Sequence, residues 1–158
     1  MNFNQIISDI KQLIGLELQA INPNTASITL MSVELDQNKY VVQASDSKKQ
    51  IIRNIVELKE IFNELEKNSY CNVDQALKGA GSSRHHPETI FANLPYIQFF
   101  KLENRKHLLL RDEAIHEYGT IDELPQKELR NIKGAIIAHK ALNINSIAQQ
   151  LNFIISKV

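Results

Sequence analysis

The chain has 158 residues, of which 43% are hydrophobic and 23% are charged, the composition of a globular protein with one domain or two small ones. Eighteen basic residues balance eighteen acidic residues, so the whole chain is neither a basic nucleic-acid arm nor an acidic tail. The single cysteine, Cys71, excludes an internal disulfide framework and fits a reducing compartment. Because the sequence has no apolar run of membrane-spanning length and no signal-peptide pattern, we expect a cytoplasmic protein without a membrane partner.

Residues 1–47 are predicted to form a small domain of one helix and three strands. Hydrophobic residues recur at helical spacing up to Ile14, and Gly15 follows where helices commonly stop. From Leu16 to Ala44 the hydrophobic period changes to two, with two turn-forming segments between the apolar runs. This pattern indicates a helix followed by an antiparallel three-stranded meander.

The next segment is predicted to begin with a long helix. Ser47 and Gln50 have the spacing of a capping box, in which two side chains satisfy backbone N–H groups reciprocally. Apolar residues from Ile51 to Leu65 then recur every three or four positions. We therefore expect a helix over residues 48–67.

Two short helices are expected next. Asn72 is a good N-cap for a helix over 72–78, which ends at a cluster of glycine and serine residues at 79–83. Pro87 suits the first turn of the second helix, because proline has no N–H to leave unpaired. Pro95 disfavours helical geometry in the residue before it, so this helix is limited to about two turns.

After the second short helix, the sequence predicts a hairpin and then further helices. Residues 96–102 and 106–110 are rich in aromatic and aliphatic side chains, and Asn104 lies in the turn between them. Residues 120–123 have the form of a second capping box, which predicts a helix from there. A last helix is expected over 145–158.

The order from the long helix to the hairpin resembles a winged helix-turn-helix. The resemblance covers about sixty residues and is carried by the element order and by the sequence DQALKGAGSSRHHPETI from Asp74 to Ile90. Continued to Pro95, this stretch also resembles segments of bacterial restriction or phage-defence proteins. The resemblance implies that the third helix lies in the DNA major groove, while the hairpin contacts the phosphate backbone or the minor groove.

The predicted fold class is therefore α+β, with three parts. These are the small helix-and-sheet domain at 1–47, the winged helix-turn-helix at 48–111 and a helical segment at 112–158. The third helix, limited by Pro95 to about two turns, is shorter than the recognition helix of the winged pattern.

The distribution of charge supports a DNA partner. Residues 1–70 hold seven basic and nine acidic residues, and residues 112–158 hold five and six. Residues 71–111 hold six basic residues against three acidic ones, so the basic part coincides with the predicted winged segment. A surface with about four to six cations binds duplex DNA modestly and in a salt-sensitive way, so useful affinity requires a homodimer or a partner protein.

Residues at the third helix and the hairpin are the candidate DNA contacts. Hydroxyl, guanidinium and imidazole donors at 82–86 are expected to hold a phosphate at the start of the third helix. Thr89 and Asn93, four residues apart, would reach base edges from one helical face. The cations around the hairpin tip would be wing contacts. The complete set is Lys78, Ser82, Ser83, Arg84, His85, His86, Thr89, Asn93, Lys101, Arg105, Lys106 and His107.

Other interpretations stay open. One alternative is a protein-interaction or adaptor module without DNA contact, in which the apolar helices face a partner chain, since fold does not settle function. A metal-dependent nuclease would use Asp36, Lys39 and histidines, although the strand-borne pairing of such sites is absent. His85 and His86 could begin a zinc site with His107 or His116, but adjacent residues seldom face one ion.

The function predicted from the sequence is sequence-independent or weakly specific binding of double-stranded DNA. The chain would act as a regulator or as the recognition part of a bacterial defence assembly, and this role requires neither catalysis nor a metal or cofactor.

Overall fold

The structure, a computed structural model, describes residues 1–78 and 84–140. The chain divides into two compact units, Met1–Glu123 and Leu124–Val158. The first unit carries both β-sheets, and the second is helical over 126–140. This division does not coincide with the expected boundaries after residues 47 and 111.

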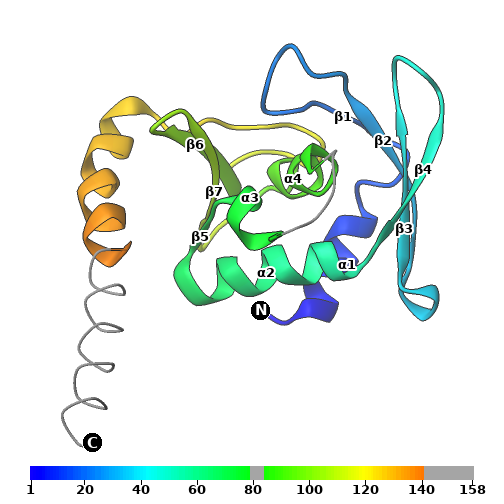
Figure 1. Cartoon of the computed structure of the whole chain (residues 1–158), viewed down its shortest axis with the longest axis horizontal. Helices are drawn as coiled ribbons and strands as arrows, with labels where there is room; N and C mark the ends of the chain where they lie inside the picture. Colours follow the sequence, from blue (N-terminus) through cyan, green and yellow to red (C-terminus); the bar gives the residue numbers. More distant parts are fainter. Residues whose placement is uncertain (79–83, 141–158) are drawn as a thin grey trace, which may run out of the picture. The chain divides into compact units, whose positions relative to one another are not determined.

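The chain is an α+β protein, as predicted, and Figure 1 labels its elements. In chain order the elements are α1 (Phe3–Lys11), β1 (Glu17–Leu18), β2 (Ile28–Glu34), the short 3-10 helix η1 (Leu35–Gln37), β3 (Lys39–Ala44), β4 (Gln50–Asn54), α2 (Val56–Asn68), β5 (Tyr70–Cys71), α3 (Val73–Ala76), α4 (His85–Ala92), β6 (Ile97–Leu102) and β7 (Arg105–Leu110).

The first sheet, which we call sheet A, has the strand order β1-β2-β3-β4 and is antiparallel throughout. Helix α1 precedes it, and Asn2 and Gln5 form a capping box at the start of this helix. The predicted helix and three-stranded meander are therefore present. The turn from β2 to β3 ends at Asn38, whose positive φ of 54° suits asparagine.

The predicted helix over 48–67 is wrong in its first part. Residues Gln50–Asn54 form β4, the fourth strand of sheet A, and α2 begins only at Val56. The expected capping box is absent, because the Ser47 hydroxyl accepts instead from the N–H of Lys49. Two adjacent isoleucines make this segment a good strand, and pairing with β3 satisfies its backbone.

The second sheet, sheet B, has the order β5-β7-β6. The hairpin β6–β7 matches the two predicted strands, and its turn holds Glu103 and Asn104 at positive φ. The strand β5, which the sequence analysis missed, joins α2 to α3 and pairs with β7. Asn72 caps α3 as predicted by accepting from the N–H of Gln75.

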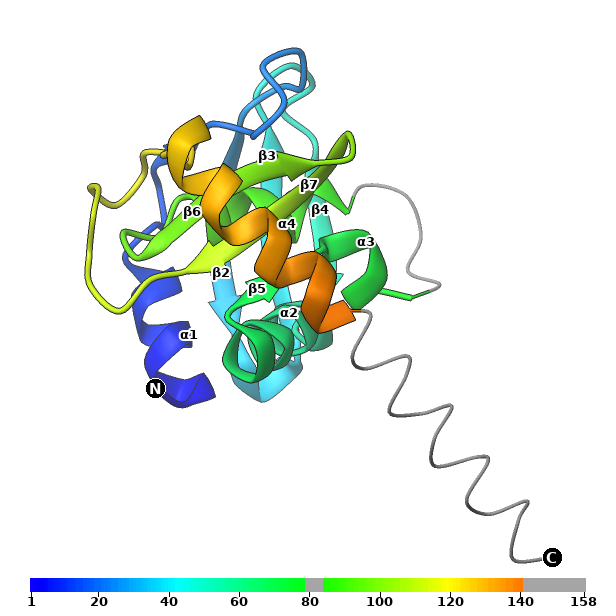
Figure 2. The ribbon, with the colours of Figure 1, turned by 90° about the vertical axis from the view of Figure 1, so that its left-hand side faces the viewer.

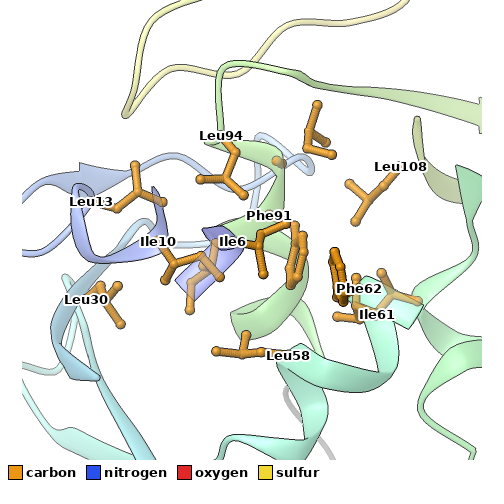
Figure 3. Close-up of a cluster of buried hydrophobic side chains, with 14 of the residues drawn as sticks. Ile6, Ile10, Leu13, Leu30, Leu58, Ile61, Phe62, Phe91, Leu94 and Leu108 are labelled. Atoms are coloured by element: carbon orange, nitrogen blue, oxygen red, sulfur yellow. The ribbon is translucent and has the colours of Figure 1, made fainter. Parts of the chain in front are cut away.

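The hydrophobic core of the first unit lies around α4. Helix α4 packs against β2 of sheet A and against β6 and β7 of sheet B (Figure 1). Figure 3 shows Phe91 of α4 among side chains from α1, α2 and β7, including Ile6, Leu58 and Leu108. Sheet A and sheet B therefore share one core, which explains why residues 1–123 form one compact unit.

The C-terminal predictions are partly wrong. The helix expected from 120–123 begins at residue 126. Thr120 does not cap it, because its hydroxyl donates to the carbonyl of Glu117 at 2.7 Å. The last helix, predicted over 145–158, lies outside the described residues.

Substitution of Leu58 tests the shared core. Leu58 is fully buried in α2, so Leu58→Ala should lower the free energy of unfolding by about 2 to 5 kcal/mol. The matched change Val56→Ala, at an exposed position of the same helix, should cost less than about 1 kcal/mol. Urea denaturation followed by circular dichroism measures both, and equal losses for the two variants would contradict the assignment of α2 to the core.

Candidate nucleic-acid interface

The helix predicted to read DNA is buried. Seven of the eight residues of α4, from His86 to Ala92, are inaccessible to solvent. Sheet A and sheet B both pack against this helix. Because a recognition helix must present one face to the groove, α4 as packed here does not enter DNA.

Thr89 and Asn93, the predicted base-reading residues, are core residues. Both side chains are 0% exposed. The Asn93 amide donates to the carbonyl of Thr89 at 2.7 Å and to that of Gln19 at 3.1 Å. The backbone carbonyl of Asn93 also accepts a hydrogen bond from the backbone N–H of Gly119 at 3.1 Å. Asn93 therefore ties the end of α4 to two loops, and the prediction that these residues read base edges is wrong.

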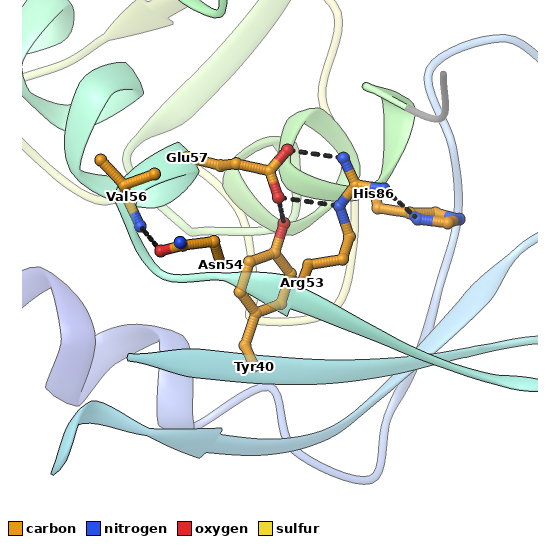
Figure 4. Close-up of polar contacts among 6 residues, drawn as sticks. All are labelled: Tyr40, Arg53, Asn54, Val56, Glu57 and His86. Carbon is orange, nitrogen blue, oxygen red and sulfur yellow. Dashed lines mark hydrogen bonds and ion pairs between the residues drawn. The ribbon is translucent and has the colours of Figure 1, made fainter. Parts of the chain in front are cut away.

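His86 belongs to a buried polar network that joins four elements of the fold. Figure 4 shows Tyr40 of β3, Arg53 of β4 and Glu57 of α2 meeting beside His86 of α4. Arg53 Nε donates to Glu57 Oε1 at 2.9 Å, and the Tyr40 hydroxyl donates to the same oxygen at 3.1 Å. Arg53 Nη1 lies 3.5 Å from His86 Nδ1. This guanidinium and the 2% exposure of His86 favour a neutral imidazole.

The protonation of both adjacent histidines is disfavoured. Burial, together with the positive charges of His85 and Arg53, lowers the pKa of His86 to about 4. Burial and the charges of Lys106 and Arg53 lower the pKa of His85. The two rings lie edge to face, with centroids 4.2 Å apart. His85 is half-buried, so it remains a candidate phosphate donor, whereas His86 is not accessible to DNA.

The hairpin brings its cations next to α4. Lys106 Nζ lies 2.8 Å from the carboxylate of Glu88, a buried residue one turn into α4. Burial raises the pKa of Glu88, and the nearby Lys106 ammonium opposes this rise. Lys101 is the cross-strand partner of Lys106, so the two side chains lie on one face of the hairpin. Arg105 is exposed at the hairpin tip.

Two further predicted residues lie between α3 and α4 in the sequence. Arg84 directly precedes α4 and lies 3.5 Å from the carboxylate of Asp74, which is on α3. Lys78 is exposed just after α3. In Figure 2, α3 and the tip of the β6–β7 hairpin lie on the same side of the first unit. We call Lys78, Arg84, His85, Lys101, Arg105 and Lys106 together the basic surface.

The remaining predicted residues are outside this surface. His107 is buried and stacks on Phe100 with ring centroids 5.0 Å apart, so the predicted wing contact of His107 is wrong. Ser82 and Ser83 lie outside the described residues, so the predicted phosphate loop is not seen.

The residues named for a nuclease or a zinc site form no metal-binding cluster in the described ranges 1–78 and 84–140. There, no group of three or more histidine, cysteine, aspartate or glutamate residues could hold a metal ion. Lys39 pairs with Glu34 at 3.6 Å, while Asp36 is exposed in η1. Burial and the charges of Glu64 and Glu88 raise the pKa of the Cys71 thiol to about 12, so this thiol is not an activated nucleophile.

Sequence reasoning missed the polar network because its residues come from four elements that pair only in the fold. One sequence signal for the burial of α4 was present. Four apolar residues follow Pro87 at spacings that place them around the helix instead of along one stripe. They are Ile90, Phe91, Ala92 and Leu94. A helix that is apolar on most sides is typically a core helix.

No protein-family model, no curated protein and no solved structure matches this chain. In the part of the chain that the structure describes, no helix is long and apolar enough to cross a membrane.

The buried His86 should make stability depend on pH. Its pKa in the folded state is below the ordinary value of 6.5, so the folded protein binds fewer protons than the unfolded chain in this range. The contribution of His86 to the free energy of unfolding is therefore fully present above pH 6.5. This contribution, about 1 to 3 kcal/mol, is lost as the pH falls towards about 4.

His86→Asn is the control variant, because asparagine does not titrate in this pH range. Urea unfolding at several pH values should show that the stability advantage of the wild type over this variant shrinks on acidification. A difference that stays constant from pH 7 to pH 4.5 would contradict the neutral, buried state of His86.

Removing one partner of the Arg53–Glu57 pair should destabilise the folded state. Glu57→Gln leaves the largely buried Arg53 charge without its carboxylate, and we expect a loss of about 3 kcal/mol in the free energy of unfolding. The double change Arg53→Met with Glu57→Met removes both charges and should recover most of that loss. Chemical denaturation of the two variants measures this, and a double variant that is as unstable as Glu57→Gln would contradict the expected recovery.

Proposed function

We propose that the chain is a DNA-binding module that contacts the phosphates of double-stranded DNA with its basic surface, independently of sequence or with weak sequence preference. In this role it serves as a regulator or as the recognition part of a larger bacterial defence assembly. The observation that carries the proposal is the convergence of Arg84, His85 and Lys106 at the first turn of α4, with Lys101 and Arg105 continuing along the hairpin.

The arrangement of elements supports a winged helix-turn-helix. Helix α2, the short helices α3 and α4 and the hairpin β6–β7 follow one another in the expected order. Strand β5 pairs with β7, which anchors the hairpin to the helices. A hairpin held in this way can present its cations to a DNA backbone without the cost of ordering a flexible loop.

The burial of α4 limits the kind of DNA recognition that is open to this protein. Thr89 and Asn93 are not accessible, so the proposal assigns no base contact to α4. Cations that touch phosphates fix position without reading sequence. Salt-sensitive binding with little sequence preference is therefore the expected behaviour.

Charge on the basic surface is partly compensated. Asp74 lies beside Arg84, and Glu88 neutralises much of the charge of Lys106. Glu103 is exposed near the hairpin tip. The affinity of one chain for DNA is then modest at physiological salt, as expected for a surface that contacts few phosphates.

A salt titration tests the proposal. Fluorescence anisotropy with a labelled duplex of about 20 base pairs should give a slope of log affinity against log salt near −4, since each phosphate contact contributes about −0.9. Arg84→Ala combined with Arg105→Ala should make this slope less negative by about 2 and weaken binding about equally on AT-rich and GC-rich duplexes.

The matched control is Lys59→Ala combined with Lys67→Ala, which removes the same charge from exposed positions of α2. This control should leave binding nearly unchanged. Absence of binding at low salt, or equal losses in the two double variants, would overturn the proposal in favour of a protein-interaction module without DNA contact.

A further inference from the structure

The four edge strands of the two sheets differ in how well they are protected against pairing with another chain. Strands β1 and β5 each have only two residues, and short edge strands are poor templates for another chain. The outer edge of β6 is covered, because Phe99 donates its N–H to the carbonyl of Asp122 at 3.0 Å and pairs with Glu123 in a parallel bridge. The fourth edge, β4, has five residues, and none of the described residues covers it.

The backbone of β4 directs three residues towards this open edge. Ile55 donates its N–H to the carbonyl of Asn38 at 3.0 Å, which fixes the alternation of hydrogen bonds between β3 and β4. In this register Arg53 and Ile51 bond to β3, so the N–H and C=O groups of Gln50, Ile52 and Asn54 point away from it. An incoming strand can bond to all of these groups.

The side chains at the edge fit such an addition. Ile52 is 68% exposed, more than any other large hydrophobic residue of the described chain, and its cross-strand neighbour on the outer face of sheet A is Val41. Gln50 and Asn54 on either side are uncharged. The one charged side chain of the strand, Arg53, points to the opposite face and is paired with Glu57.

We propose that β4 pairs with β4 of a second copy of this chain, antiparallel and with the two-fold axis at Ile52, so that two copies of sheet A form one continuous sheet. The register is self-complementary. Ile52 lies opposite Ile52 of the second copy, where two β-branched side chains stabilise a cross-strand pair, and Gln50 lies opposite Asn54.

The charges at the two ends of β4 favour a second copy in this orientation. Lys48 and Lys49 outnumber Asp46 at the start of the strand, and all three are exposed. At its other end, the hydrogen bond from Ile55 to Asn38 holds the turn with exposed Asp36 beside the strand, and Lys39, the cross-strand neighbour of Asn54, is already paired with Glu34. An antiparallel copy brings the basic end of each strand to the acidic end of the other.

This pairing gives a weak dimer, because five residues on each side bury less surface than a standard interface. The inference does not depend on the proposed DNA binding. It is tested by the mass of the protein in the absence of DNA.

Sedimentation velocity of the whole chain from about 10 to about 500 µM should show a rise from monomer to dimer over this range. Ile52→Pro should abolish the rise, because proline removes an outward-pointing N–H but no hydrogen bond to β3. Ile52→Val is the matched control and should keep the dimer. A wild type that stays monomeric, or a dimer unaffected by Ile52→Pro, would overturn the proposal.

A second variant keeps the test valid if Ile52→Pro fails to fold. The two-fold axis places the Cα atoms of the two Ile52 residues about 5.5 Å apart, within the range of a disulfide. Ile52→Cys should therefore form a cross-linked dimer under mild oxidation, whereas Met31→Cys, an exposed position on β2 away from the edge, should not. Equal cross-linking of the two variants would contradict pairing through β4.

Discussion

The burial of α4 between the two sheets is the constraint on which the rest of the structure depends. Because both sides of this helix are covered, sheet A and sheet B share one core instead of forming separate domains. Burial also favours partners within the fold for the polar side chains of this helix, and three of them have one. His86 meets Arg53, Glu88 meets Lys106, and the Asn93 amide meets two backbone carbonyls.

The same constraint divides the predicted DNA-binding residues into two classes. Residues that point from α4 into the core hold the sheets together, whereas Arg84 before its first turn and Lys101, Arg105 and Lys106 on the hairpin remain exposed or half-exposed. Positive charge thus collects where phosphates could approach, while the side chains that could have read bases are enclosed. The geometry therefore favours contact with the DNA backbone over recognition of a particular sequence.

Local patterns predicted much of the fold, and long-range pairing explains what they missed. Gly15, Asn72 and Asn104 mark boundaries through their own conformational preferences, so the first helix, α3 and the hairpin could be placed. Ile51 and Ile55 fit a helical period as well as a strand, and only the partner strand β3 decides between them. Thr89 and Asn93 have the spacing of a helix surface, but the sheet that covers them comes from distant residues.

Helix α4 is a core helix, and we propose that DNA contacts only the basic surface. A two-dimensional NMR titration of isotope-labelled protein with a short duplex tests it most directly. Signals of Lys101, Arg105 and Lys106 should shift with increasing DNA, while those of Thr89 and Asn93 should stay in place and their amides should exchange with solvent only on global unfolding. Shifts concentrated on Thr89 and Asn93, with fast exchange of their amides, would contradict both the buried position of α4 and the proposed DNA contact.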